Sequence, residues 1–304
     1  MTKNKTKTGR AIRIVLLTAA IVALLVAVYF RTNPVWTAAE RTILPADRFY
    51  DIQSVDPDGT TLETRILPPE GYSRVPVESG SFGEYLRNYP MLPDDIQIPV
   101  FDGTTINNTD TAAIFDISIG DEGYQQCADS VIRLYSDYFY ETGQLDRISF
   151  LFSNGDECNY DRWRRGKRML VFAGLSVEIP AALPDDSEQQ YRNYLKEVMR
   201  YAGTLSLQKE SEVISPEEMR IGDIICNDTH VVMIVDEAVN DKGEKCYLLG
   251  QSFIPAVCFH VITWTEGRNN VSPWFTQEQL SQTQSSVLQF GLNKNDIRRW
   301  KGGF

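Results

Sequence analysis

The sequence predicts an α+β domain that follows a single N-terminal apolar segment. Residues 14–30 are apolar except for Thr18 and carry no charge. Farther along, residues 127–140 and 187–201 have apolar side chains at helical spacing. Short β-branched runs separated by Gly and Asp follow, and they predict a meander of antiparallel strands. We therefore expect helices first and a sheet after them.

The N-terminal segment has the pattern of a membrane anchor. Five cations precede the apolar run, at positions 3, 5, 7, 10 and 13. A positive flank before an uncharged run of about 17 residues is typical of a transmembrane helix whose flank stays in the cytoplasm. We expect the membrane as a partner and an extracytoplasmic position for the rest of the chain. A cleaved signal peptide, followed by secretion, is the alternative, because residues 37–39 are small.

The rest of the chain reads as a stalk and one domain. Residues 1–31 form the flank and anchor, residues 32–70 are rich in Pro, Asp and Thr and are expected to form a stalk, and residues 71–304 form the domain. The formal charge of −11 becomes −16 when the five flanking cations are set aside. So acidic a chain is not expected to bind nucleic acid, since phosphate binding needs a basic face.

Turn and breaker residues delimit the elements of the domain. A helix at 81–87 stops before Pro90, a strand at 112–119 stops at Gly120, and the helix from residue 127 closes at Gly143. Strands are expected at 224–226, 230–235 and 246–250, with a connecting turn at 240–243. A last strand is expected at 287–290 and a helical turn at 296–300.

Cysteine and histidine usage narrows the possible chemistry. The five cysteines are an odd number, which leaves at least one free thiol in an exported chain. The chain has no CxxC pair and no clustered Cys/His spacing, so we expect no metal site and no cofactor. Only two histidines are present.

Cys127 is the candidate nucleophile. It is expected in the first turn of a helix, where the positive end of the helix dipole favours a thiolate, and Asp129 also suits that position. A small core residue is the plain alternative, since buried free cysteines are common. His230 favours the catalytic reading because it opens an apolar strand and should lie at the edge of the sheet. An imidazole there can accept the thiol proton.

Gln251 is the candidate third residue, which would fix the tautomer of His230. A four-residue turn at 240–243 places Val232 opposite Gln251 and makes Gln251 the diagonal neighbour of His230 on the same face. A slip of one residue would put Ser252 there instead. A solvent-exposed Gln251 is the alternative.

Four other residues compete for roles at the site. His260 lies inside an apolar stretch and is expected to be structural, and Asp236 is a second candidate for orienting His230. Gln125 and Gln126 precede the nucleophile and could offer an amide donor to an oxyanion, with the Cys127 backbone N–H as the second donor.

The order of these residues resembles a known superfamily. Cys127, then the Gly-Asp-hydrophobic strand at 222–225, then His230 and a polar Gln251 are similar to the NlpC-type members of the papain-like cysteine peptidases, over residues 124–253. The resemblance implies a papain-like fold, a helix against an antiparallel sheet, with Cys127, His230 and Gln251 as its catalytic residues. The chain departs from the pattern in its linker, because about 80 residues separate the helix after Cys127 from Gly222, and they include an insert that contains Trp163 and a long helix.

A second resemblance covers nearly everything after the stalk. The strings at 81–87, 124–134, 201–207 and 251–256 look like those of a bacterial domain-of-unknown-function family. This likeness implies an exported protein and brings no established reaction.

Together these observations predict an exported, membrane-tethered thiol hydrolase that cleaves an amide bond. Cell-wall peptides are the expected substrate and partner. A basic run at 162–168 is one candidate for contacting them. The alternatives are an inactive papain-like binding module at the cell envelope and a thiol acyltransferase acting on lipid or lipoprotein.

Overall fold

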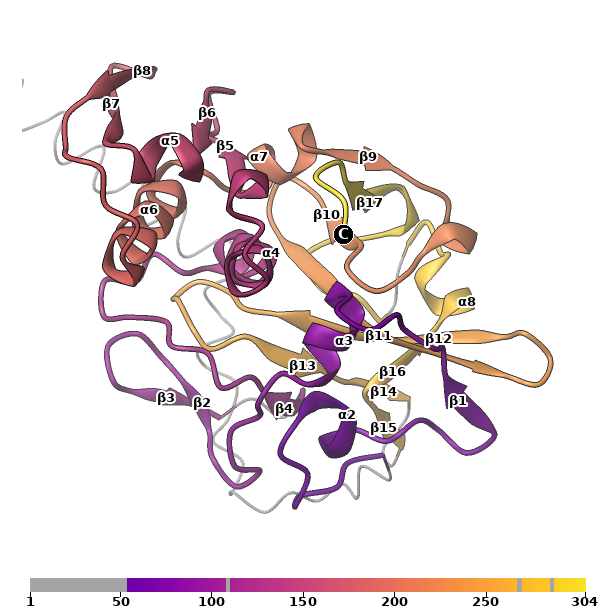
Figure 1. Cartoon of the computed structure of the whole chain (residues 1–304). Helices are drawn as coiled ribbons and strands as arrows, with labels where there is room; N and C mark the ends of the chain where they lie inside the picture. Colours follow the sequence, from indigo (N-terminus) through magenta and orange to yellow (C-terminus); the bar gives the residue numbers. More distant parts are fainter. Residues whose placement is uncertain (1–53, 108–109, 267–269, 285–286) are drawn as a thin grey trace, which may run out of the picture. The chain divides into compact units, whose positions relative to one another are not determined.

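A nine-stranded antiparallel sheet organises the domain (Figure 1). The computed structural model describes residues 54–107, 110–266, 270–284 and 287–304. The main path of the sheet runs β4-β13-β12-β11-β10-β17-β9, while β1 pairs with β11 and β16 with β12. The strands of this sheet are β1 (Tyr72–Arg74), β4 (Thr111–Ile114), β9 (Ser211–Val213), β10 (Ile224–Cys226), β11 (Val231–Asn240), β12 (Lys245–Gln251), β13 (His260–Ile262), β16 (Trp274–Thr276) and β17 (Ile297–Trp300).

Helices and small hairpins surround the sheet. The hairpins pair β2 (Ile98–Pro99) with β3 (Thr105–Ile106), β5 (Ser149–Leu151) with β6 (Glu157–Asn159), β7 (Lys167–Phe172) with β8 (Leu175–Pro180), and β14 (Trp264–Glu266) with β15 (Asn270–Ser272). The α-helices are α2 (Leu62–Arg65), α3 (Phe82–Arg87), α4 (Cys127–Glu141), α5 (Tyr160–Arg164), α6 (Glu188–Tyr201), α7 (Thr204–Lys209) and α8 (Gln277–Leu280). The short 3-10 turns are η2 (Leu145–Arg147), η3 (Pro216–Glu218) and η4 (Lys294–Asp296).

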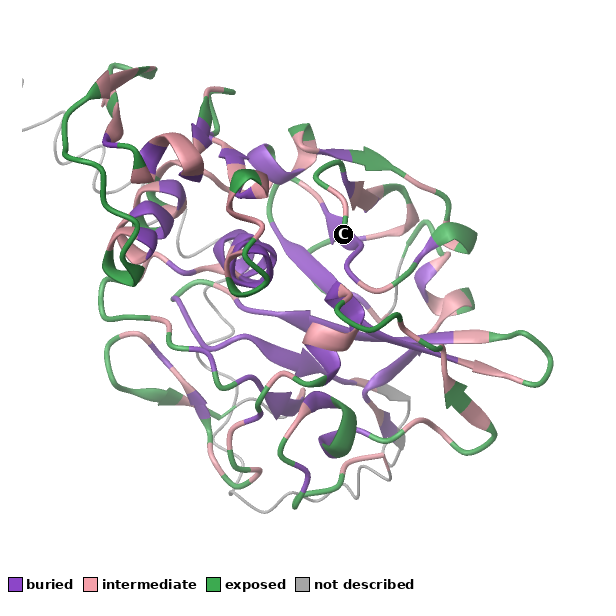
Figure 2. Ribbon diagram, in the orientation of Figure 1, coloured by how far each residue is buried: buried purple, intermediate pink, exposed green. Residues whose placement is uncertain are grey.

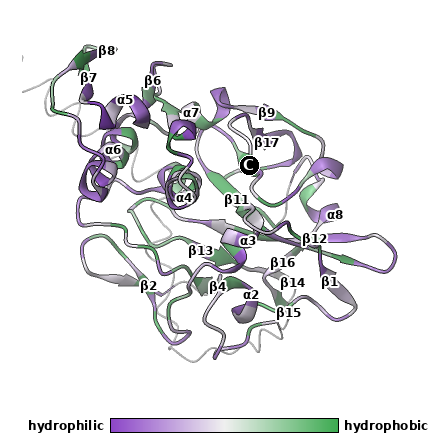
Figure 3. Ribbon diagram, viewed as in Figure 1, coloured by the Kyte–Doolittle hydropathy of each residue, from purple (hydrophilic) through white to green (hydrophobic). Residues whose placement is uncertain are grey.

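β11 is buried on both of its faces, as the continuous purple of the central strands in Figure 2 shows. Val231, Met233 and Val235 pack into the core that contains α4. Val232 and Ile234 pack into a second core on the other face, with residues such as Phe275. The apolar run at residues 231–235 of β11, in the green part of that strand in Figure 3, follows from burial on both sides.

The helix α4 forms where its spacing predicts. Val131, Leu134 and Tyr138 lie on its buried face. At its start the backbone N–H of Gln126 donates to Asp129 Oδ2, and it ends before Gly143, whose φ of 73° suits glycine. The helix therefore carries Cys127 at its first residue and rests on β11.

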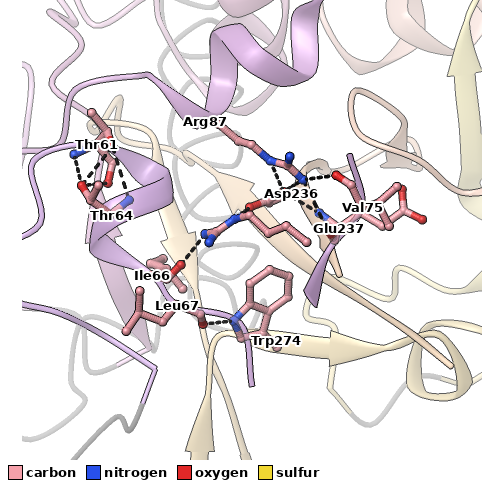
Figure 4. Close-up of polar contacts among 10 residues, drawn as sticks. Thr61, Thr64, Ile66, Leu67, Val75, Arg87, Asp236, Glu237 and Trp274 are labelled. Atoms are coloured by element: carbon pink, nitrogen blue, oxygen red, sulfur yellow. Dashed lines mark hydrogen bonds and ion pairs between the residues drawn. The ribbon is translucent and has the colours of Figure 1, made fainter. Parts of the chain in front are cut away.

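The domain begins earlier than residue 71. Leu62 and Ile66 are fully buried in the main core, and Trp274 of β16 donates its indole N–H to the carbonyl of Leu67 (Figure 4). The sequence from residue 54 to 70 was expected to belong to a stalk because polar residues dominate it. Leu62 and Ile66 are nevertheless core residues, so this stretch belongs to the domain.

The expected register of the β11–β12 hairpin is off by one residue at its tip and correct at the site. At the tip, Val239 pairs with Lys245 rather than with Glu244. A bulge at Val235 then absorbs one residue, so that Met233 pairs with Gly250. Continued by one residue, this register places Val232 opposite Gln251, as predicted.

Two C-terminal elements differ from expectation. Residues 287–290 do not form a strand, and Phe290 has a φ of 58°. Residues 297–300, expected as a helical turn, form strand β17 between β10 and β9. Both segments are short, and their apolar residues fit either structure, so sheet pairing decided between them.

The architecture is mixed α/β with mostly antiparallel strands, which confirms the coarse fold class predicted from the sequence. Within the described residues no helix is long and apolar enough to cross a membrane. The expected transmembrane helix at residues 14–30 lies outside the described residues.

Candidate functional site

The candidate site lies where α4 begins and the adjoining ends of β11 and β12 meet. Cys127 is the first residue of α4, His230 directly precedes β11, and Gln251 ends β12. All three side chains are buried, with at most 8% of each exposed. The fold thus brings His230 into contact with Gln251 and places Cys127 beside the backbone of Val231.

A hydrogen bond joins His230 to Gln251. The imidazole Nε2 lies 2.8 Å from the side-chain Oε1 of Gln251. An amide oxygen only accepts, so in this arrangement Nε2 carries the ring proton of a neutral imidazole. The other ring nitrogen, Nδ1, is then the basic one, which is the tautomer that a general base requires.

A polar turn holds the backbone of His230. Asn227 Oδ1 accepts from the backbone N–H groups of Thr229 and His230. The amide Nδ2 of Asn227 donates to the carbonyl of Phe290, and the hydroxyl of Thr229 donates to the same oxygen. One asparagine therefore fixes both the start of β11 and the chain segment that covers the histidine.

Phe290 covers the imidazole. The two ring centroids are 4.2 Å apart, so the aromatic ring shields the ring of His230 from water. A small pocket lies beside this contact, lined by residues that include Val232, Ile262 and Leu288, with about 20 Å³ open to water. That space holds about one water molecule, so a substrate must displace the 287–292 segment to reach His230 from this side.

Two serines tie the start of α4 to the end of β12. Ser130 Oγ lies 2.7 Å from Ser252 Oγ, and Ser252 Oγ also donates to the carbonyl of Gln126 at 2.9 Å. Ser252 follows Gln251 directly, so its bonds fix the helix that carries Cys127 against the strand that carries Gln251.

The thiol of Cys127 is held as a neutral group. Burial raises its pKa to about 11, and Asp129 adds to the rise, while backbone N–H groups of Ala128 and Val231 act in the opposite direction. The helix start was expected to make this thiol unusually acidic; burial outweighs that effect. The contact with the Val231 N–H also places the sulfur beside the peptide that follows His230.

The imidazole of His230 is neutral as well. Burial lowers its pKa to about 4, against the opposing effect of the Gln251 bond. Within the described part of the chain, no hydrogen bond joins Cys127 Sγ to His230. The structure therefore holds the thiol and the imidazole as two neutral groups, rather than as an ion pair.

The other candidates have different positions. Asp236 is not an orienting group, because it is fully buried in ion pairs with Arg74 and Arg87, as Figure 4 shows for Arg87. Gln125 is buried, and its Oε1 accepts from Arg133 two turns along α4, whereas its Nε2 has no hydrogen-bond partner among the residues that the structure describes. Gln126 donates to the carbonyl of Gly123.

Three arginines of the basic run form ion pairs with neighbouring carboxylates. Arg162 pairs with Glu157 and Glu178, and both Arg164 and Arg165 pair with Asp161. These residues belong to α5 and the turn after it, and none of them lines the pocket beside His230.

Removal of the Phe290 ring should raise the pKa of His230. In Phe290→Ala the imidazole gains water, and because burial is the main cause of its lowered pKa, we expect the value to rise from about 4 towards 6.5. A proton NMR titration of the two histidines measures this. His260 serves as the internal control, since its ring packs against Phe253 instead. An unchanged titration of His230 in a folded variant would contradict the shielding role.

No candidate metal site was found among the described residues. All five cysteines lie in that part of the chain, and they are buried free thiols.

The comparison with protein families gives one match. A family described as "Domain of unknown function (4846)" matches residues 62–299. The chain belongs to this family. Neither the curated proteins nor the solved structures contain a match to the chain. The family match begins at the first residue of α2, which agrees with the early start of the domain.

Sequence reasoning missed Phe290 and Ser130. Phe290 was assigned to a strand, and its position over His230 depends on a backbone with positive φ that a non-glycine residue rarely adopts. Ser130 is one turn after Cys127, and its only sequence signal was a small polar residue on the buried face of a helix.

Proposed function

We propose that this domain is a cysteine hydrolase of papain-like arrangement that cleaves an amide bond. Cys127 acts as nucleophile, His230 as base and then acid, and Gln251 as the residue that orients His230. The observation that carries the proposal is the 2.8 Å bond from His230 Nε2 to Gln251 Oε1, which leaves Nδ1 as the basic nitrogen. The buried start of α4 beside Val231 supports the role of Cys127.

The chemistry follows from two neutral partners. His230 Nδ1 takes the thiol proton as the sulfur attacks the amide carbonyl, and the carbonyl oxygen becomes an oxyanion near the N–H groups at the start of α4. His230 then gives the proton to the leaving amine, and water hydrolyses the thioester. Proton transfer needs the thiol and imidazole within hydrogen-bond reach, so a side-chain rotation accompanies substrate binding.

Cell-wall peptide is the substrate class that we propose. The support comes from the sequence: the N-terminal segment is typical of an anchor, and such an anchor would put the domain outside the cytoplasm, where wall peptides are abundant. The two rival functions, a binding module and a thiol acyltransferase, share the same residues. The raised pKa of the Cys127 thiol bears equally on the hydrolase and the acyltransferase, since both need a reactive sulfur, whereas the binding module needs none.

Cleavage of muropeptides by the full chain tests the proposal. We expect new amine termini with the natural protein and with Cys158→Ala, a matched control for another buried cysteine. Cys127→Ala should reduce the rate by at least about 10³-fold, as loss of a nucleophile does. Equal binding without turnover by all three proteins would replace the hydrolase with the binding module. Cleavage that persists in Cys127→Ala would remove the nucleophile assignment.

The location is tested separately. We expect a C-terminally tagged chain to fractionate with membranes and to be digested when intact protoplasts are treated with protease. Recovery of a soluble, protected product from the cytosol would exclude the tether.

A further inference from the structure

A second histidine lies directly behind the proposed orienting residue. His260 is fully buried on β13 and is the cross-strand partner of Gln251 on β12. Directly opposed residues in an antiparallel pair project from the same face, with Cβ atoms about 5 Å apart. His230, Gln251 and His260 thus follow one another across three neighbouring strands.

The tautomer of His260 follows from its surroundings. Its Nδ1 lies 2.9 Å from the carbonyl oxygen of Cys258, and a carbonyl only accepts, so Nδ1 carries a proton. Burial lowers the pKa of His260 to about 4, which leaves the ring neutral near pH 7. Its Nε2 is therefore an acceptor, and this buried atom has no hydrogen-bond partner within the described chain.

The amide of Gln251 has two possible orientations with opposite consequences. When Oε1 of Gln251 points towards His230, the amide NH₂ is left to face His260 Nε2. A donor then meets an acceptor. With the amide turned over, Oε1 would meet the lone pair of His260, and the NH₂ would meet His230 Nε2. In that second arrangement the ring proton of His230 lies on Nδ1. Nδ1 could then not take a proton from the thiol.

We propose that His260 is a positioning residue, which accepts a hydrogen bond from Gln251 Nε2. It thereby selects the tautomer of His230 that carries its proton on Nε2 and leaves Nδ1 free to accept a proton. The donor and the acceptor sit on directly paired residues, although the bond itself is not made in this structure. A rotation of one side chain would give the unpartnered Nε2 of this completely buried histidine a donor. A buried acceptor without a donor is unfavourable, which favours that rotation.

This inference rests on the proposed function for its purpose, but its test does not depend on activity. The full chain contains only two histidines, so ring ¹⁵N-histidine labelling gives two imidazole spin systems, and the tautomer of each follows from its nitrogen shifts. In the natural protein we expect His230 to carry its proton on Nε2 and His260 on Nδ1. A proton on Nδ1 of His230 would overturn the proposal.

Variants of His260 separate positioning from packing. In His260→Phe we expect His230 to become a mixture of both tautomers, and any hydrolysis to lose kcat in proportion to the wrong tautomer with KM unchanged. His260→Gln, whose side-chain oxygen can accept from Gln251, should restore the Nε2–H tautomer. His260→Gln also keeps the positioning role testable if His260→Phe fails to fold. A single Nε2–H tautomer in folded His260→Phe, or a mixture in folded His260→Gln, would overturn the role. If the tautomers behave as expected and no substrate is cleaved, the proposed function fails and the positioning role stands.

Discussion

Asp236→Ala should lower the free energy of unfolding by about 3–5 kcal/mol. The carboxylate is completely buried, with Arg74 Nε 2.6 Å from one oxygen and Arg87 Nη2 2.8 Å from the other. Its removal leaves two mostly buried guanidinium groups without their counter-charge, and it frees the segment before α3 from β11. Urea unfolding followed by circular dichroism gives the difference.

A compensated variant tests the reason for that loss. Asp236→Leu combined with Arg74→Met and Arg87→Met removes all three charges, and we expect it to be more stable than Asp236→Ala, because no charge stays buried alone. If the triple variant is the less stable of the two, the ion pairs themselves, rather than the cost of orphaned charges, dominate.

The stability of the domain should fall as the pH rises from about 6.5 to 8. Burial raises the pKa of Asp129 and of Glu210 to about 8 each. A carboxyl whose pKa is higher in the folded state binds its proton more tightly there, so its contribution is complete below its unfolded pKa near 4 and is lost as the pH rises to 8. The loss is about 1.4 kcal/mol per pH unit and group, or about 2 kcal/mol per group over this interval.

The two histidines act with the opposite sign at lower pH. Their pKa values are lowered to about 4, so they destabilise the fold as the pH falls from 6.5 to 4. In that window the histidines and the carboxyls offset each other, and we expect a nearly flat profile. Asp129→Asn and Glu210→Gln should each remove about half of the slope above pH 6.5 in urea titrations at several pH values. Slopes equal to that of the natural protein would show that these carboxyls are ionised in the folded state.

Local pattern was enough to predict the parts of the site that depend on one element. Cys127 begins a helix because apolar spacing and a glycine bound that helix, and His230 opens a strand because a polar turn precedes an apolar run. Register led to Gln251, although the tip pairing that it assumed is off by one residue and the bulge at Val235 makes up the difference; the Oε1 of Gln251 lies 2.8 Å from Nε2 of His230.

Features that depend on tertiary packing could not be predicted. The helix dipole favours an acidic thiol at Cys127, but the depth of burial, which the sequence does not reveal, decides its pKa. Phe290 reaches His230 through a left-handed backbone conformation, and Asp236 meets arginines that lie about 150 residues earlier. His260 was rightly expected inside the sheet, but its pairing with Gln251 follows only from strand order.

Because of the bulge at Val235, the number of residues at the tip of the β11–β12 hairpin can change without altering the geometry at the base of the hairpin. An insertion or deletion in the loop at 240–244 changes pairing between that loop and the bulge, where Asp236 pairs with Leu248. Closing the bulge with Val235 kept in the ladder would be different, because Val235 would then pair with Leu249, and Ser252 would replace Gln251 opposite Val232. Among homologous chains, length variation should therefore collect at the tip of this hairpin, while the spacing from His230 to the bulge stays constant.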